Sequence, residues 1–389
     1  MSRHKEFFPS QMHLAPVRLL GGFICVDMHI GCRGCSYCLN RRSPALARIL
    51  DQRIRFRLRD MGVSVRHLFS LVEQTWSYSR ASVPIRCGHL TDWRYQIEET
   101  EAFYRMLPAD YPFVVLTRFP LGDRQRALAR GQPNLLLHVS LTPPIPGRER
   151  DNQPPERVIE SVASVPNENL FFMCRPLVSG NRRRNEELVD ALPPGSSAGF
   201  HGISTDGIRA ATGLLGVSDE ELGELRARAR ARGVRVLDFF GCALWRRLRR
   251  PFFKYEEAAA RPESGCVECP NLSVCRDQRS GTTPPRIVTE LRRLGIRPQC
   301  TVVNQGRVFV ETSTPVSRAE EIYLSMMTGS PVTISSVARS AGKGVLIMST
   351  SILDRWQATG FAPVSALRDL SERIDREVAE RTRLGAAHI

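Results

Sequence analysis

Short apolar runs alternate with amphipathic stretches along the first 240 residues. Runs rich in β-branched and aromatic residues, such as FVVLTRFPL over 113–121, are typical of buried strands, whereas PERVIESVASVP over 155–166 has the spacing of a helix with one apolar face. Strands separated by helices form parallel sheets, so this series predicts an α/β fold, a partial (β/α)6 barrel of TIM type. The six predicted strands lie in 18–28, 82–93, 113–121, 134–144, 169–178 and 197–204.

The pattern changes twice after residue 240, which predicts three units: a barrel over 1–240, a cysteine-rich extension over 241–280 and a small C-terminal α/β or α+β appendage over 281–389. The appendage covers the barrel mouth, binds a partner or is a purely structural cap. Further helices are predicted over 43–62, 95–107, 185–193, 286–296, 317–329 and 364–383, with a hairpin over 299–314.

The net positive charge of the chain makes anionic partners plausible. The chain has 55 Lys and Arg against 40 Asp and Glu, a net charge of +15, with arginine-rich runs over 181–187, 226–235 and 246–254. Nucleic acid is one partner that fits these runs, and solvated helix faces are an equal alternative. The N-terminus has no apolar segment of a signal peptide and no stretch is long enough to cross a membrane, so we expect a soluble, cytoplasmic protein without a membrane partner.

The sequence GCRGCSYCLN over 31–40 places Cys32, Cys35 and Cys38 on one short loop. Close-spaced thiols in a reducing compartment indicate metal binding or catalysis. Three thiolates do not complete a four-thiolate site, so either a distant residue supplies the fourth ligand or one metal position stays open. A zinc knuckle completed by Cys25 or His29 is the structural alternative.

A three-cysteine loop after the first strand of a (β/α) barrel, with Tyr37 before its last cysteine, resembles the radical S-adenosylmethionine (SAM) superfamily. That family usually has C-x3-C-x2-C, whereas this chain has C-x2-C-x2-C. The resemblance continues over 18–240. GHLTDWRYQIEE is similar to the TDPYQPxE stretch of the spore photoproduct lyase type, and FVVLTRFPLGDR, HVSLTPP and FMCRPLVSG are similar to its third, fourth and fifth strands.

The resemblance implies a set of cofactor-binding residues. Cys32, Cys35 and Cys38 would hold a [4Fe–4S] cluster, and one iron would chelate S-adenosyl-L-methionine. Electrons from a donor such as flavodoxin or ferredoxin would then cleave this cofactor to a 5′-deoxyadenosyl radical that abstracts hydrogen from a substrate. The residues implied to contact the cofactor are Tyr37 at the adenine, Gly88, His89 and Thr91 at the methionine amino group, and Ser140, Thr142 and Arg175 at the ribose and carboxylate.

Two cysteines at predicted strand ends have two interpretations. Cys87 and Cys174 are either small buried hydrophobes or hydrogen-donating catalytic thiols that face the substrate.

A second cysteine group follows the predicted barrel. Cys266, Cys269 and Cys275 have the spacing C-x2-C-x5-C, with Cys242 upstream, and resemble the core of the SPASM extension. The last cysteine of that pattern is replaced by Arg279, and Cys242 or Cys300 is the candidate substitute. The group predicts an auxiliary [4Fe–4S] cluster or a zinc site.

These observations favour a radical SAM enzyme that acts on a peptide or specialised-metabolite substrate. Two alternatives remain: a radical SAM enzyme of nucleic-acid repair or modification, and a zinc-stabilised nucleic-acid-binding protein.

Overall fold

A computed structural model gives the fold of the chain. It describes residues 16–20, 23–31, 47, 49–50, 55–76, 84–109, 111–145, 153–203, 213–237, 242–243, 284–293, 297–304, 307–312, 332–336 and 362–386.

The largest element is a sheet of eight strands whose spatial order follows their order along the chain. All neighbouring pairs from β2 to β10 are parallel, and β1 is antiparallel to β2. The predicted α/β alternation with a parallel sheet is therefore confirmed. In sheet order the strands are β1 (Val17–Leu20), β2 (Phe23–Val26), β5 (Ile85–Cys87), β6 (Phe113–Thr117), β7 (Leu135–Leu141), β8 (Leu170–Cys174), β9 (Ser197–Phe200) and β10 (Arg235–Val236).

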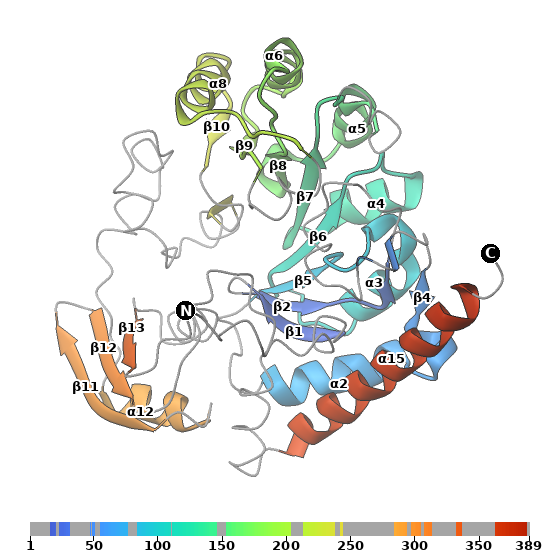
Figure 1. Ribbon diagram of the computed structural model, residues 1–389, viewed down its shortest axis with the longest axis vertical. Helices are drawn as coiled ribbons and strands as arrows, with labels where there is room; N and C mark the ends of the chain where they lie inside the picture. The colour runs from blue at the N-terminus through green and yellow to red at the C-terminus, as the bar shows by residue number, and fades with distance from the viewer. Residues whose placement is uncertain are drawn as a thin grey trace.

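Helices lie along one side of this curved sheet, which we call its outer face (Figure 1). Each crosses between successive parallel strands, as parallel pairing requires. They are α2 (Val65–Trp76), α3 (Ile97–Tyr104), α4 (Asp123–Gly131), α5 (Pro155–Val162), α6 (Arg182–Ala191) and α8 (Asp219–Ala231).

Alternation along each strand divides the core between the two faces of the sheet. Val115 and Phe172 belong to the large cluster on the outer face, whereas their neighbours Val114 and Phe171 belong to a smaller cluster on the inner face. Successive side chains of a strand point to opposite faces, so position along a strand decides which face a residue serves.

Several predicted elements differ from the observed ones. The strand predicted over 18–28 is two antiparallel strands, β1 and β2. The helix predicted over 43–62 is wrong in its second half, which holds β4 (Phe56–Arg57), paired with β3 (His29–Ile30), and the 3-10 turn η3 (Leu58–Met61). Helices α2, α4 and α8 and strand β10 were not predicted.

The C-terminal part contains α12 (Pro284–Arg293) and a three-stranded sheet. Strands β11 (Pro298–Asn304) and β12 (Arg307–Thr312) are antiparallel, which confirms the predicted hairpin, and β13 (Val332–Ser336) is parallel to β12. The helix predicted over 317–329 and nearly all of the cysteine-rich extension lie outside the described residues.

The last helix, α15 (Ala362–Ala386), packs along α2 (Figure 1). Its side chains at Leu370, Ile374 and Val378 are buried at helical spacing, so one face of α15 belongs to the large core cluster. None of the helices in the described ranges is both long and apolar enough to cross a membrane.

Asp375 on α15 makes stability depend on pH. Burial, and to a smaller extent the charge of Glu372, raises the pKa of Asp375 to about 7. Because this folded pKa lies above the ordinary value, the protonated form stabilises the fold, and that contribution is lost as pH rises from about 4 through 7. In urea unfolding at pH 8, Asp375→Asn should have a free energy of unfolding about 1–2 kcal/mol above that of the parent, after allowance for solvent screening. At pH 4 the two proteins should be equally stable.

The control is Glu372→Gln, which removes the smaller cause and should change stability at pH 8 by less than Asp375→Asn. Parallel loss of stability in Asp375→Asn and the parent across this pH range would contradict the assignment.

Candidate functional site at the carboxyl edge of the sheet

Four of the sequence-predicted residues lie on the inner face at the carboxyl ends of the strands. Ser140 on β7 is opposite Met173 on β8, which is an inner-face residue. Thr142 and Arg175 each lie two residues further along the chain, just beyond the ends of β7 and β8, and so have the same inner-face phase. Gly88 is two residues beyond Arg86, which is opposite the inner-face residues Cys25 and Val114. Parallel strands end at one edge, so the structure brings these four positions to the same edge.

The buried carboxylate of Asp27 joins the end of β2 to the loop after β5. Its Oδ1 accepts hydrogen bonds from the backbone N–H groups of Gly88 (3.1 Å) and His89 (2.9 Å). Gly88 has φ +94°, and a Cβ there would lie 2.9 Å from the backbone oxygen of Leu116. Glycine is therefore required where this loop passes against β6.

The same loop holds Gly31, the residue directly before Cys32. Thr91 Oγ1 donates to the Gly31 oxygen (2.7 Å), and the Gly31 N–H donates to the Leu90 oxygen (3.2 Å). These bonds fix the start of the three-cysteine loop at the carboxyl edge, beside the end of β5.

Segment 27–31 is also held from α3. Gln96 Oε1 accepts hydrogen bonds from the backbone N–H groups of Met28 (3.0 Å) and His29 (3.3 Å), and His29 Nε2 lies 3.2 Å from Glu99 Oε1. Burial lowers the pKa of His29 despite this contact. The segment before the cysteine loop is thus anchored along its whole length.

Asp92 ties the loop after β5 to the end of β6. Its Oδ1 accepts from Thr117 Oγ1 (3.0 Å) and the Arg94 N–H (2.9 Å), and its Oδ2 accepts from the Arg118 N–H (2.8 Å). Burial raises the pKa of Asp92 although these three donors oppose the shift.

A shallow, open pocket with room for about one water molecule lies at this edge between β6 and β7. Ser140 and Thr142 line it together with the guanidinium-bearing Arg118. Thr142 Oγ1 donates to the Arg175 oxygen (2.6 Å), which fixes the strand end beside the pocket. Phe119, Leu141, Gln153 and Val158 complete the lining. Such a mixture of one cation, hydroxyls and apolar walls suits contact with one anionic group of a ligand, although the pocket is too small to enclose a whole ligand.

Cys87 and Cys174 lie away from this edge pocket. Both are fully buried in the cluster between the sheet and its helices, and burial raises the pKa of the Cys174 thiol. This position is that of a small buried hydrophobe, so neither thiol enters the proposal below.

The predicted metal ligands Cys32, Cys35, Cys38, Cys266, Cys269 and Cys275, together with Tyr37, lie outside the described residues. Cys242 is partly buried and packs against both core clusters. Within the described ranges, no group of three or more His, Cys, Asp or Glu side chains is arranged to hold a metal ion. Cys25 lies in the inner-face cluster and His29 contacts Glu99.

Sequence reasoning missed Asp27, Asp92, Gln96 and Arg118. Arg118 lies two residues after the apolar run 113–116, a position similar to that of the strand-end residues Ser140 and Thr142, and was overlooked. Nothing in the sequence pairs Asp27 or Gln96 with backbone groups more than 60 residues away.

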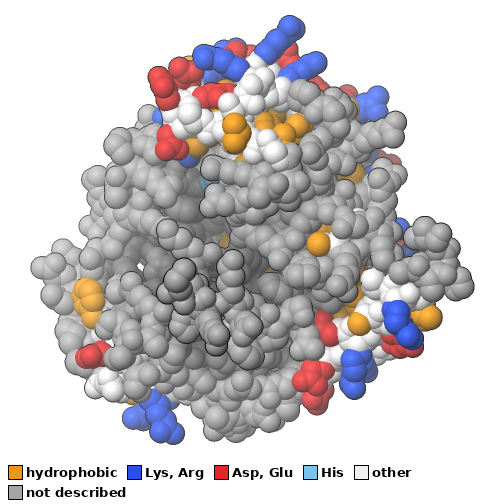
Figure 2. Space-filling view, in the orientation of Figure 1, with side chains coloured by type: hydrophobic (Ala, Val, Ile, Leu, Met, Phe, Trp, Pro, Cys, Tyr) orange, Lys and Arg blue, Asp and Glu red, His pale blue; other side chains and the backbone are white. Residues whose placement is uncertain are grey.

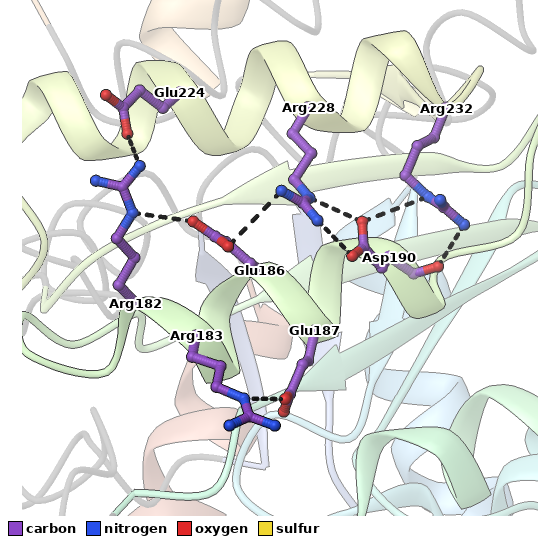
Figure 3. Close-up of polar contacts among 8 residues, drawn as sticks. All are labelled: Arg182, Arg183, Glu186, Glu187, Asp190, Glu224, Arg228 and Arg232. Atoms are coloured by element: carbon purple, nitrogen blue, oxygen red, sulfur yellow. Dashed lines mark hydrogen bonds and ion pairs between the residues drawn. The ribbon is translucent and has the colours of Figure 1, made fainter.

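Two of the arginine-rich runs lie on α6 and α8, where acidic side chains neutralise them (Figure 3). Arg228 contacts both oxygens of Asp190 (2.8 and 2.6 Å) and lowers the pKa of that carboxyl. Arg182 bridges Glu186 on α6 and Glu224 on α8, both at 2.9 Å. Acidic and basic side chains are interspersed over these helices in Figure 2. This surface is therefore a mixed-charge face rather than a basic patch.

No protein-family model matches this chain, and no curated protein is significantly similar to it.

The contact of Gly88 with β6 predicts a specific cost of adding a methyl group. Gly88→Ala should destabilise the protein by about 3 kcal/mol in urea unfolding, because it combines a positive φ with an approach to the Leu116 oxygen. Gly62→Ala is the matched control: Gly62 has φ +73° but no atom within 4 Å of its Cβ position. That variant should lose only about 1 kcal/mol. Equal losses in the two variants would disprove the close approach.

The paired arginines predict weak, diffuse binding to nucleic acid. Anisotropy of a labelled mixed-sequence single-stranded DNA should show binding that falls steeply between about 0.05 and 0.15 M salt. Replacing Arg183 and Arg184 on α6 by Gln should weaken it by less than about threefold, because counterion release is shared over the surface. As a matched control, the double variant Arg373→Gln and Arg376→Gln on α15 should weaken DNA binding to the same small extent. Loss of binding in the α6 pair alone would identify an interface there.

Proposed function

We propose that this chain is a radical SAM enzyme whose SAM-cleaving [4Fe–4S] cluster is held by Cys32, Cys35 and Cys38. The observation that carries the proposal is the anchoring of Gly31 to Leu90 and Thr91 at the carboxyl edge of the parallel sheet. Function in such folds lies at this edge, and a three-cysteine loop that starts there is well placed for chemistry.

The finer fold in this proposal is a partial (β/α)6 barrel. An unbroken strand order from β2 to β10, with helices on one face, supports it because a barrel wall winds in one direction. A cysteine-rich extension over 241–280 and an appendage over 281–389 complete the proposed organisation.

The donor set fits the proposed group. Three thiols on a seven-residue stretch provide the ligand type that iron–sulfur clusters require, and Gly31 gives the loop a fixed starting point. When bound, a cluster of this kind supplies an electron for reductive cleavage of the SAM sulfonium, with flavodoxin or ferredoxin as the class of external donor.

The described residues would bind and orient the rest of the cofactor. Ser140 and Arg118 line the pocket at the carboxyl edge, where a hydroxyl and a guanidinium would provide partners for ribose hydroxyls and a carboxylate. Asp27 holds the Gly88–His89 backbone in place near the proposed amino-group site. The apolar side chains of the inner-face cluster would keep water from the side of the site that faces the interior of the sheet.

The substrate class in this proposal is a peptide or specialised metabolite, and the second cysteine group would hold an auxiliary [4Fe–4S] cluster. Cys242, the described member of that group, packs against the inner-face cluster, which supports a centre near the interior of the sheet. The neutralised arginines of α6 and α8 weigh against nucleic-acid modification and against a zinc-stabilised nucleic-acid-binding protein.

Two matched triple variants test the two cysteine groups. Replacing Cys32, Cys35 and Cys38 by Ala should abolish dithionite-dependent formation of 5′-deoxyadenosine and leave iron at about half the parent amount, because the auxiliary centre remains. The same change at Cys266, Cys269 and Cys275 should remove the other half of the iron while retaining SAM cleavage.

Circular dichroism should show the helix content of both triple variants unchanged. Retained SAM cleavage in the first triple variant would overturn the proposed function, and loss of all iron from it would contradict an independent second centre.

A further inference from the structure

Two exposed arginines lie over neighbouring aromatic rings at the carboxyl edge of the eight-stranded sheet. The guanidinium carbon of Arg55 is 4.2 Å from the centre of the Tyr95 ring, and that of Arg94 is 4.9 Å from the centre of the Phe119 ring. The two rings meet edge to face, with their centres 5.8 Å apart. These four residues therefore form one continuous group, which we call the stacked-arginine surface.

The stacked-arginine surface lies where the chain leaves β5 and β6 for the helices that follow them. Tyr95 belongs to the 3-10 turn η4 (Trp93–Tyr95), between β5 and α3, and Phe119 lies two residues after the end of β6. Arg55 directly precedes β4 and Gly31 directly follows its partner β3, so these two residues lie at the same end of that antiparallel pair. A ligand on this surface would therefore lie beside the start of the three-cysteine loop.

Buried hydrogen bonds hold the backbone beneath this surface. Asp92 Oδ1 accepts from the Arg94 N–H (2.9 Å), and its Oδ2 accepts from the Arg118 N–H (2.8 Å). Thr117 Oγ1 donates to the same carboxylate (3.0 Å) and accepts from the Phe119 N–H (3.1 Å). The chain that carries Arg94 and Phe119 is thus anchored to one buried carboxylate.

The local charge of the surface is positive. Within the described ranges, neither Arg55 nor Arg94 has an ion pair with a carboxylate. Arg57, two residues after Arg55, adds a further exposed arginine. Glu98 and Glu99, the acidic residues at the start of α3, each contact a basic side chain of another element. An anionic partner is therefore complementary to this surface.

The stacking indicates which part of an anionic chain can bind here. Both arginines are exposed, so N–H groups of their guanidiniums remain accessible to a carboxylate. The rings are less accessible: Phe119 is 5% exposed and Tyr95 is half-buried, and a guanidinium lies over each. Neither ring offers an open face on which a nucleotide base could stack. Carboxylates of a peptide fit this arrangement better than a single-stranded nucleic acid.

The neighbouring pocket indicates how such a ligand would lie. Phe119 also lines the shallow pocket at this edge, which has room for about one water molecule. An enclosed small molecule would need far more volume. A ligand with several carboxylates would therefore lie across the surface and not inside a cavity.

We propose that the stacked-arginine surface binds an acidic segment of a peptide, with carboxylates at Arg55 and Arg94. Contact with a ring restricts each guanidinium before binding, which lowers the entropic cost of fixing it on a carboxylate. The segment lies across the carboxyl edge, next to the start of the cysteine loop. Its assignment to the substrate, unlike the binding itself, rests on the proposed function.

Fluorescence anisotropy on the full chain measures this binding. The probe is a labelled peptide of alternating glutamate and glycine, in about 0.15 M salt to screen diffuse attraction, and its glutamine counterpart is the uncharged control. Arg55→Gln and Arg94→Gln should each weaken binding of the glutamate peptide by about fivefold, because each removes a charge-assisted hydrogen bond.

A variant that keeps every charge separates the stacked arrangement from a diffuse positive field. Tyr95→Leu removes the ring under Arg55 and should weaken peptide binding by about threefold. The matched control is Arg59→Gln, which removes a nearby exposed arginine that contacts Asp60 (3.7 Å) and should leave the affinity within about 1.5-fold. Circular dichroism should show the helix content of all four variants unchanged.

Three results would overturn the binding surface: no binding of the glutamate peptide, equal binding of its glutamine counterpart, or the same weakening in Arg59→Gln as in Arg55→Gln. Labelled single-stranded DNA tests nucleic acid as the occupant. Larger losses of DNA binding than of peptide binding in the arginine variants would assign the surface to nucleic acid and overturn the peptide. Flavodoxin that displaces the peptide and binds more tightly would assign the surface to the electron donor, with the same consequence.

Formation of 5′-deoxyadenosine by the parent protein tests the proposed function separately. If the parent does not cleave S-adenosylmethionine, the proposed function fails, and with it the assignment of the peptide to the substrate. The peptide affinities of the variants still decide whether the surface binds an acidic segment.

Discussion

The carboxylate of Asp27 joins the two strand ends from which the candidate site is built. It is fully buried at the end of β2 and accepts the N–H groups of Gly88 and His89 after β5. A buried carboxylate is costly unless it accepts hydrogen bonds, and the backbone N–H groups of this loop are costly to bury unless they donate. The pairing therefore holds both Asp27 and the loop in position. Thr91 Oγ1 donates to the Gly31 oxygen and the Gly31 N–H donates to the Leu90 oxygen, and both bonds depend on the loop being held there. The cysteine loop begins one residue after Gly31.

The two faces of the main sheet carry different kinds of side chain. The outer face is apolar and packs against the helices, where Cys87 and Cys174 serve the core. The inner face combines an apolar layer with basic and hydroxyl-bearing residues toward the carboxyl edge. Arg182, Arg183 and Arg228 on α6 and α8 are engaged in ion pairs on the outer side, so the described surface of these two helices has mixed charge (Figures 2 and 3). The arginine-rich run 246–254 lies outside the described residues.

The sequence predicted the sheet well because buried parallel strands are short, continuous apolar runs bounded by polar residues. It failed in the second half of 43–62, where apolar residues alternate at Ile54, Phe56 and Leu58: this is the period of a strand, and the stretch holds β4 in place of the predicted helix. Polar residues at strand ends led correctly to the edge occupied by Ser140 and Thr142. The sequence left Cys87 and Cys174 as either buried hydrophobes or thiols that face the substrate, and the structure buries both between the sheet and its helices.

We propose that the loop after Gly31 carries a cluster with one iron open to S-adenosylmethionine. Electron paramagnetic resonance of the anaerobically reconstituted, dithionite-reduced protein tests this proposal. We expect a reduced [4Fe–4S] signal whose shape changes when S-adenosylmethionine is added, because the cofactor would ligate the open iron. A signal that S-adenosylmethionine leaves unchanged, or a colourless protein that contains zinc, would contradict it.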